Sequence, residues 1–227
     1  MQIKDLEITY LNHSGFRVDQ KDKTFIFDYF PENGVGYLNP ETLRGRDVVV
    51  FSSHRHHDHY TPEIFSWEDS AKTITWILSD DIPAVPGRGR VFVRPGKTYA
   101  AGDICIRTLE STDEGAAFLV KSGERVIYHA GDLNWWHWTD ESDAYNLDME
   151  QRYKHQIELL KGEKIDVAFL PLDPRQEQNY ILGMDWFLRH VCTDFVFPMH
   201  FWGRREVFDW LRQDARAQDW IQKVVFF

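Results

Sequence analysis

The segment Val48–Tyr60 constrains this chain more than any other stretch of its sequence. It opens with Val48–Phe51, a run of β-branched and aromatic residues typical of a fully buried strand. Two serines follow, and the next six positions include His54, His56, His57, Asp58 and His59. If residues 54–58 stay extended, the side chains of His54, His56 and Asp58 point the same way, because side chains alternate along a strand. Neutral imidazoles and a carboxylate that converge at a strand end suit a divalent ion such as zinc.

The second half of this segment suits a second ion. Asp58 and His59 are adjacent, so they cannot both face the point that His54 and His56 share. The pattern His54-x-His56-x-Asp58-His59 matches, without substitution, the metal-binding signature of the metallo-β-lactamase superfamily. The chain resembles that superfamily, in which the first two histidines hold one metal and the Asp-His pair holds the second. The alternative is a solvated, histidine-rich loop, but loops rarely place such a cluster directly after a buried strand.

Two later segments agree with this resemblance in order and spacing. A strand expected over Arg125–His129 leads into Ala130-Gly131-Asp132, where Asp132 matches the superfamily's metal-bridging carboxylate. A strand expected over Asp194–Pro198 leads to His200, which matches the final metal ligand. Without the resemblance, Asp132 would read as a turn cap and His200 as a core histidine.

One ligand of the superfamily pattern is missing. A third histidine normally serves the first metal from a loop before the Gly-Asp pair, but Glu110–Gly115 stands there and contains no histidine. Asp113 lies at about the right position, and a carboxylate can bind zinc or a harder ion such as manganese or iron. Glu114 is the competing candidate. The remaining alternative is a weak or empty first site, with one metal working alone.

Two residues near the N-terminus are candidates for supporting roles. By resemblance, Asp28 braces the metal loop from behind the ligands, and the alternative is a simple turn cap at a strand end. His13 follows the first strand, and we expect it to pack or hydrogen-bond at the strand end rather than to bind metal.

Substrate contacts are expected in two segments. Trp135, Trp136 and His137 follow the Gly-Asp pair, and this tryptophan-rich segment forms either an apolar wall for substrate or a hydrophobic plug. Asp173 and Arg175 lie in a strand-to-helix loop, where they either fix a substrate group or form a salt bridge. The tryptophans and the guanidinium together indicate a small, partly apolar substrate that carries an anionic group.

Length and charge limit the other classes of function. The 227 residues predict one domain, residues 1–227, and the formal charge of −10 argues against a nucleic-acid partner. The chain has no apolar run near the roughly 20 residues that span a bilayer, so we expect no membrane partner. Two cysteines and no secretory pattern after Met1 favour the cytoplasm. A homo-oligomer is left open.

Local patterns predict several further elements. A hairpin is expected around Ser122-Gly123-Glu124, and a short helix is expected from Thr61-Pro62-Glu63 to about Trp67. The other expected strands are Phe16–Val18, Phe25–Tyr29, Thr73–Leu78, Val91–Val93, Ile104–Leu109, Ala116–Lys121 and Lys164–Leu170, and the other expected helices are Asp148–Lys161, Ile181–His190 and Glu206–Ala215.

The resemblance implies an α+β fold, the four-layer αββα sandwich of the metallo-β-lactamase type, in its compact lactonase-like branch. It implies two divalent metal ions, zinc first, with manganese or iron as alternatives. The expected protein is an enzyme whose metal-bound hydroxide cleaves an ester, lactone, amide or phosphoester bond of a small substrate. Asp58 would orient that hydroxide and Asp132 would bridge the metals. The alternatives are a non-catalytic metal-binding module with a degraded first site and a small metal-dependent nuclease, which the acidic charge disfavours.

Overall fold

The computed structural model describes residues 1–32 and 36–227 of the chain. These residues form two compact units, the first from Met1 to Arg94 and the second from Pro95 to Phe227. Each unit contains one mixed β-sheet, and each is described by itself.

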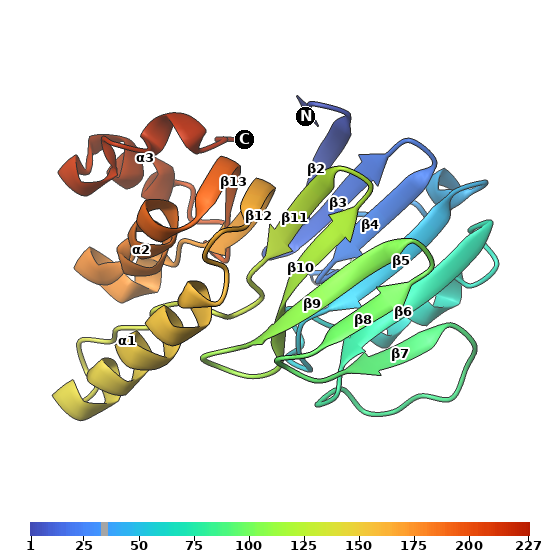
Figure 1. The fold of residues 1–227 in the computed structure, drawn as a ribbon, viewed down its shortest axis with the longest axis horizontal. Coiled ribbons are helices and arrows are strands. Elements are labelled where there is room, and N and C mark those ends of the chain that lie inside the picture. The colour runs from blue at the N-terminus through green and yellow to red at the C-terminus, as the bar shows by residue number, and fades with distance from the viewer. Residues whose placement is uncertain (33–35) are drawn as a thin grey trace. The chain divides into compact units, whose positions relative to one another are not determined.

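The first unit is built on a seven-stranded sheet with the strands in sequence order (Figure 1). Neighbouring strands pair antiparallel from the first to the fourth and parallel from the fourth to the seventh, so the sheet is mixed. The strands are β1 (Gln2–Ile3), β2 (Leu6–Asn12), β3 (Gly15–Gln20), β4 (Lys23–Phe27), β5 (Asp47–Ser52), β6 (Thr73–Ser79) and β7 (Arg90–Val93).

The strand β5 lies between β4 and β6, with parallel pairing on both sides. Its residues after Asp47 are all buried, as expected for a run that has no polar alternation. The 3₁₀ helix η2 (Pro62–Trp67) follows the histidine motif and begins as predicted, with the Thr61 side chain accepting from the Glu63 amide. Trp67 is buried in the same apolar cluster as Val48 and Val50, which packs η2 onto the sheet. The other 3₁₀ helix of this unit is η1 (Pro40–Leu43).

The second unit is built on a six-stranded sheet in the order β13-β12-β11-β10-β9-β8. The two pairs at the β13 end are parallel and the remaining three are antiparallel. The predicted hairpin is confirmed, because Ser122 pairs with Arg125 across the turn. The strands are β8 (Thr98–Ala101), β9 (Ile104–Glu110), β10 (Ala116–Ser122), β11 (Arg125–His129), β12 (Lys164–Pro171) and β13 (Cys192–Met199).

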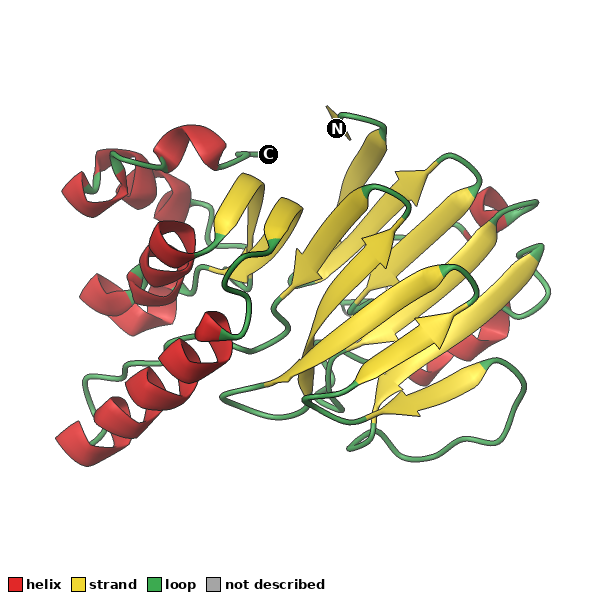
Figure 2. Ribbon diagram, in the orientation of Figure 1, coloured by secondary structure: helices red, strands yellow, loops and turns green. Residues whose placement is uncertain are grey.

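Three α-helices belong to this second unit, and Figure 2 shows them beside the β12–β13 end of its sheet. The helix α2 contacts both β12 and β13, and it also contacts α1. The helices are α1 (Asp143–Glu158), α2 (Leu182–His190) and α3 (Glu206–Gln213), and the 3₁₀ helices are η3 (Pro174–Asn179), η4 (Ala215–Ala217) and η5 (Ile221–Lys223). Within the described residues, no helix is long and apolar enough to cross a membrane.

The predicted bounds of two helices, Asp148–Lys161 and Glu206–Ala215, differ from the observed ones by two or more residues. The helix α1 begins at Asp143 rather than Asp148, because the Ser142 hydroxyl accepts from the Tyr145 amide and starts the helix before its apolar residues begin. The helix α3 ends at Gln213 because Asp214 is extended, with φ −74° and ψ 122°, and its side chain caps η4 instead. The short strand β8 was not predicted, since two of its four residues are alanines, which are depleted in strands.

Candidate metal centre

The histidine motif turns at the end of β5 instead of continuing it. The last ladder pair of β5 is Ser52 with Leu78, and beyond it the amides of His59 and Tyr60 both donate to the His56 carbonyl at 3.0 Å. The extended conformation considered for residues 54–58 is therefore wrong, because the strand loses its ladder partners before His54. The turn still brings Nε2 of His54 to 3.0 Å from Nδ1 of His56.

A second group of donors lies in the same unit. Nε2 of His13 is 3.3 Å from Oδ2 of Asp58, and Nε2 of His59 is 3.9 Å from the same oxygen. All three side chains are buried. Four ligands at roughly 2.0–2.1 Å from a tetrahedral ion lie roughly 3.3–3.4 Å apart, so these spacings are of the right size for a shared metal ion. The sequence predicted that His13 packs or hydrogen-bonds at a strand end, and its contact with Asp58 is compatible with that prediction.

Asp28 lies directly behind His59. Its Oδ2 is 2.7 Å from Nδ1 of His59, and its two oxygens also accept from the Ser53 amide at 2.7 Å and the Ser53 hydroxyl at 2.6 Å. The carboxyl is fully buried. Asp28 therefore braces the histidine loop, as predicted, and it leaves Nε2 of His59 directed away from it.

In the second unit, Asp132 and His200 come together from two different strand ends. Gly131, with φ 51°, turns the chain after β11 and brings Asp132 to the end of the sheet. His200 follows β13, and its Nε2 is 3.4 Å from Oδ1 of Asp132. Asp113 offers a carboxylate oxygen within 4.8 Å of one from Asp132, and Glu114 belongs to no such group in the described part of the chain.

His200 also has a buried carboxylate behind it. Oδ2 of Asp173 is 3.0 Å from Nδ1 of His200, and Asp173 is fully buried. Burial by itself would lower the pKa of His200, but the charges of Asp132 and Asp173 raise it to about 10. Burial would raise the pKa of Asp173, but His200 and Arg175 lower it to about 2. This pair is therefore an ion pair at neutral pH when no metal competes for Nε2.

The tryptophan segment contains residues of two different kinds. Trp136 is buried beside the donors: its indole donates to the Asp132 carbonyl at 3.0 Å, and its ring lies 5.5 Å from that of His200. Trp135 instead packs edge-on against Trp186, under the ammonium of Lys154. Trp135 therefore packs as the predicted plug would, and a substrate contact of Trp136 stays a prediction. His137 is half-buried and makes no hydrogen bond or ring contact among the described residues.

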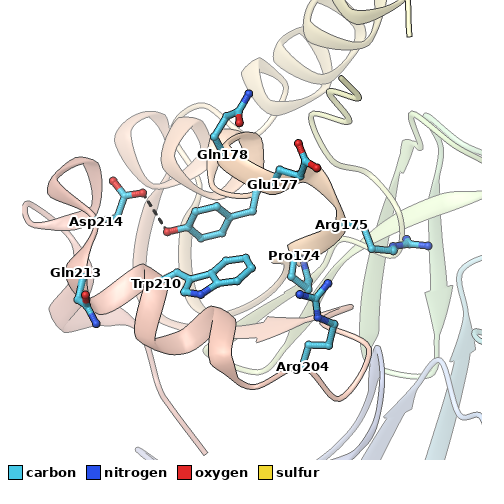
Figure 3. Close-up of a pocket in the computed structure, with 9 residues that line it drawn as sticks. Pro174, Arg175, Glu177, Gln178, Arg204, Trp210, Gln213 and Asp214 are labelled. Atoms are coloured by element: carbon cyan, nitrogen blue, oxygen red, sulfur yellow. Dashed lines mark hydrogen bonds between the residues drawn. The ribbon is translucent and has the colours of Figure 1, made fainter. Parts of the chain in front are cut away.

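Arg175 lies at the rim of an open cavity of about 670 Å³ in the second unit. Figure 3 shows Trp210 near the middle of this cavity and the Arg175 guanidinium directed away from it. The guanidinium binds Asp173 through Nε at 2.9 Å and lies 4.6 Å over the Trp202 ring. Asp173 and Arg175 thus form the salt bridge that was one of the two expectations for this loop, and Asp173 lies behind His200. Their contact with substrate stays a prediction.

Structural comparison finds proteins with the same fold at low sequence identity. One is Igni18, a metallo hydrolase from the archaeon Ignicoccus hospitalis, with TM-score 0.63 and 16% identity over 98% of this chain and 94% of that one. A second is a candidate metal-dependent hydrolase from Parabacteroides distasonis, with TM-score 0.64 and 18% identity over 92% and 89%. A third is CmlA, a diiron β-hydroxylase from Streptomyces venezuelae, with TM-score 0.55 and 15% identity over 88% of this chain and 45% of that one.

Sequence comparison then identifies the family. None of the curated proteins matches the chain. The profile of the beta-lactamase superfamily domain matches residues 7–200, a range that holds every donor described above. The α+β fold with two mixed sheets and helices, expected from the resemblance, is confirmed, and with it a fold typical of metal-dependent hydrolases. The chain belongs to the metallo-β-lactamase superfamily.

Proposed function

We propose that this protein is a metal-dependent hydrolase that cleaves an ester, lactone, amide or phosphoester bond of a small substrate. One observation carries the proposal. His59 and His200 each have a fully buried carboxylate at Nδ1, Asp28 at 2.7 Å and Asp173 at 3.0 Å, and each directs Nε2 at another carboxylate. A carboxylate–histidine pair of this kind fixes the tautomer and raises the basicity of a metal ligand. A packing histidine would need neither.

The donor sets follow the superfamily pattern with one substitution. By the superfamily pattern, His54, His56 and Asp113 would hold the first ion, Asp58, His59 and His200 would hold the second, and Asp132 would serve both. Imidazole nitrogens and carboxylate oxygens are the donors that zinc, manganese and iron accept in proteins. Asp113 therefore fits the chemistry of the set, although it adds a negative charge where the family has a neutral ring.

The residues of the candidate centre have different roles in the proposed hydrolysis. The ions, when bound, lower the pKa of a water molecule towards neutrality and act as Lewis acids on the scissile bond. Asp58 would accept a hydrogen bond from that water and orient it. Trp136 presents an apolar surface beside His200, which excludes bulk water and contacts the apolar part of a substrate. Asp173 holds His200 in place from behind rather than contacting substrate, since it is fully buried.

The carboxylate content of the sets bears on the metal. Asp58, Asp113 and Asp132 supply hard oxygen donors, which shift preference from zinc towards manganese and iron. CmlA, which shares the fold, is a diiron protein. We propose two divalent ions per chain and include Fe²⁺ and Mn²⁺ with Zn²⁺ in every test.

Metal analysis combined with a substrate panel tests the proposal. Protein reloaded with Zn²⁺, Mn²⁺ or Fe²⁺ is expected to bind about two ions and to hydrolyse at least one of a lactone, a carboxylic ester, an amide and a phosphodiester. His59→Ala should lower the metal content and abolish the hydrolysis, with an unchanged circular dichroism spectrum.

His57→Ala is the matched control, because the His57 side chain is 86% exposed in the same loop. It should retain both metal and activity. Full metal content and full activity in His59→Ala would refute the assignment. Metal binding without hydrolysis of any class of substrate would instead favour the non-catalytic binding module.

A further inference from the structure

His13 occupies a position that the superfamily motif does not include. It lies in the turn between β2 and β3, and it is only 4% exposed. Nothing in the pattern of the surrounding residues requires a histidine there, since a tight turn between antiparallel strands is served by asparagine or glycine. Its burial and its partners therefore have to explain why a histidine occupies this turn.

The backbone at this turn holds the His13 side chain in one place. His13 adopts the left-handed conformation with φ 50°, as does His200 with φ 61°. Such conformations cost energy for residues with a Cβ and cluster at functional sites. Gly15 fixes the turn from the other side: a Cβ there would lie 2.8 Å from the Asn12 carbonyl oxygen and 3.0 Å from that of Asp28. The turn is thus packed against Asp28, the residue that holds His59.

The His13 imidazole reaches the same carboxylate oxygen as His59. Nε2 of His13 and Nε2 of His59 lie 3.3 and 3.9 Å from Oδ2 of Asp58, and one donor atom from each of the three residues lies within 4.8 Å of the others. The two rings meet edge to face at a centroid distance of 5.5 Å. Two nitrogens and one oxygen thus surround one point, at spacings close to the roughly 3.3–3.4 Å of a tetrahedral ligand set.

We propose that His13 is a metal ligand, and that His13, Asp58 and His59 form a three-donor set for a divalent transition ion. All three residues belong to the first unit. The inference rests on the proposed function and adds one donor to it. Two imidazoles and one carboxylate suit zinc and also Fe²⁺, which favours this combination.

A simple hydrogen bond between His13 and Asp58 is the competing explanation. It predicts that loss of His13 lowers the stability of the protein equally with and without metal. A ligand role predicts instead that the variant loses metal affinity, and that the stabilisation gained on adding metal shrinks.

The test compares His13→Ala, His13→Gln and His59→Ala with wild type and with the exposed-residue control His57→Ala. Dissociation constants for Co²⁺ and Zn²⁺ are measured with a competing chelator, together with the cobalt absorption spectrum and the melting temperature with and without metal. Both His13 variants are expected to weaken the affinity for one of the bound ions by at least about tenfold and to change the cobalt absorption spectrum. His57→Ala should match wild type.

Each outcome decides between the explanations. If His59→Ala loses metal while both His13 variants keep wild-type affinity and spectrum, the His13 proposal is wrong and the proposed function stands. If neither His59→Ala nor the His13 variants lose metal, both the His13 proposal and the proposed function are wrong. Should the His13 variants not fold, a crystal structure of metal-loaded wild type decides, since a ligand requires an Nε2–metal distance of roughly 2.0–2.1 Å. A distance above roughly 3 Å overturns the proposal.

Discussion

Several residues of the candidate centre adopt backbone conformations that are unfavourable for their type. His13, Asp28 and His200 all have positive φ, at 50°, 41° and 61°. Each follows or joins a strand, so the sheet fixes the backbone before and after it. Conformations of this kind cost of order 1–3 kcal/mol and persist where the surrounding structure imposes them. The three residues share a consequence: each directs a donor or a supporting carboxylate at a neighbouring donor.

Asp113 is the candidate for the histidine ligand that this chain lacks, and its substitution separates the alternatives. Asp113→Ala should lose one of two bound ions, because the first ion would retain only His54, His56 and the bridging Asp132. Asp113→His should keep both ions and shift preference towards zinc. Metal content by mass spectrometry, with Zn²⁺ and Mn²⁺ in competition, measures both effects.

A metal-bound crystal structure gives the direct check on Asp113. Its carboxylate oxygen should lie roughly 2.0–2.2 Å from an ion. A carboxylate directed into solvent in that structure would make Glu114 the next candidate, and a single-metal enzyme the one after it.

Arg175 tests the class of substrate. Its side chain is 45% exposed although it pairs with Asp173, so one face remains open to an anionic group. If it binds such a group equally in the ground and transition states, Arg175→Ala should raise KM more than it lowers kcat. The exposed Arg212→Ala on α3 is the control for loss of charge. Changes below about twofold in both constants, about 0.4 kcal/mol, would show that Arg175 has a structural role only.

At the scale of elements, the tryptophan segment packs closely on α2 at a glycine, Gly183. An ideal Cβ on Gly183 would lie 1.9 Å from Oδ1 of Asn134 and 3.1 Å from the Trp135 amide nitrogen. Asn134 cannot easily move, because it is buried and donates to Gln176 at 3.0 Å. The glycine therefore allows the segment after Asp132 to pack directly on the helix.

Gly183→Ala should lower the melting temperature, even though alanine favours a helix by about 1 kcal/mol over glycine. Overpacking of this kind costs about 1–3 kcal/mol, so the clash outweighs the propensity. Thermal unfolding of the single variant and of Gly183→Ala with Asn134→Ala measures the coupling. The double variant should be less destabilised than the sum of the two single ones, because removing Asn134 relieves the clash. Additive effects would contradict the role given to Gly183.

Asp214, at the start of η4, should make part of the free energy of unfolding depend on pH. A hydrogen bond from Arg216 holds the pKa of Asp214 below 3.8, and the carboxyl also accepts from Tyr180 at 3.0 Å. A lowered pKa stabilises the fold above pH 3.8, and that stability is lost as the pH falls through the folded-state value. Arg216→Met should therefore lose less free energy of unfolding than wild type between about pH 5 and about pH 2. Equal losses measured by urea unfolding would refute this.

At the scale of the whole molecule, the sequence predicted best what short-range patterns determine. Apolar runs located the strands around Val50, Val120 and Phe169, and the histidine motif with the Gly-Asp pair located most of the donors. It predicted poorly what depends on tertiary contacts. The direction of the His13 side chain was not predicted, because it depends on the close approach of Gly15 to Asp28. The position of Asp173 behind His200 was not predicted, because it depends on how β12 pairs with β13.

Metal removal tests the molecule as a whole. The chain carries a formal charge of −10, and Asp28, Asp132 and Asp173 are buried carboxylates beside the candidate donors. A cation bound by the donors beside these carboxylates is attracted to their negative charge and binds only the folded chain, so metal should raise the free energy of unfolding. At a free metal concentration of about 100 times the dissociation constant the gain is about 2.7 kcal/mol. For a chain of this size that corresponds to a rise of roughly 5–11 °C in Tm. Differential scanning calorimetry of chelator-treated protein, before and after reloading, measures the shift, and Mg²⁺ at the same concentration controls for non-specific ion effects. An unchanged Tm with Zn²⁺, Mn²⁺ and Fe²⁺ alike would mean that these carboxylates and histidines form a polar core and bind no metal.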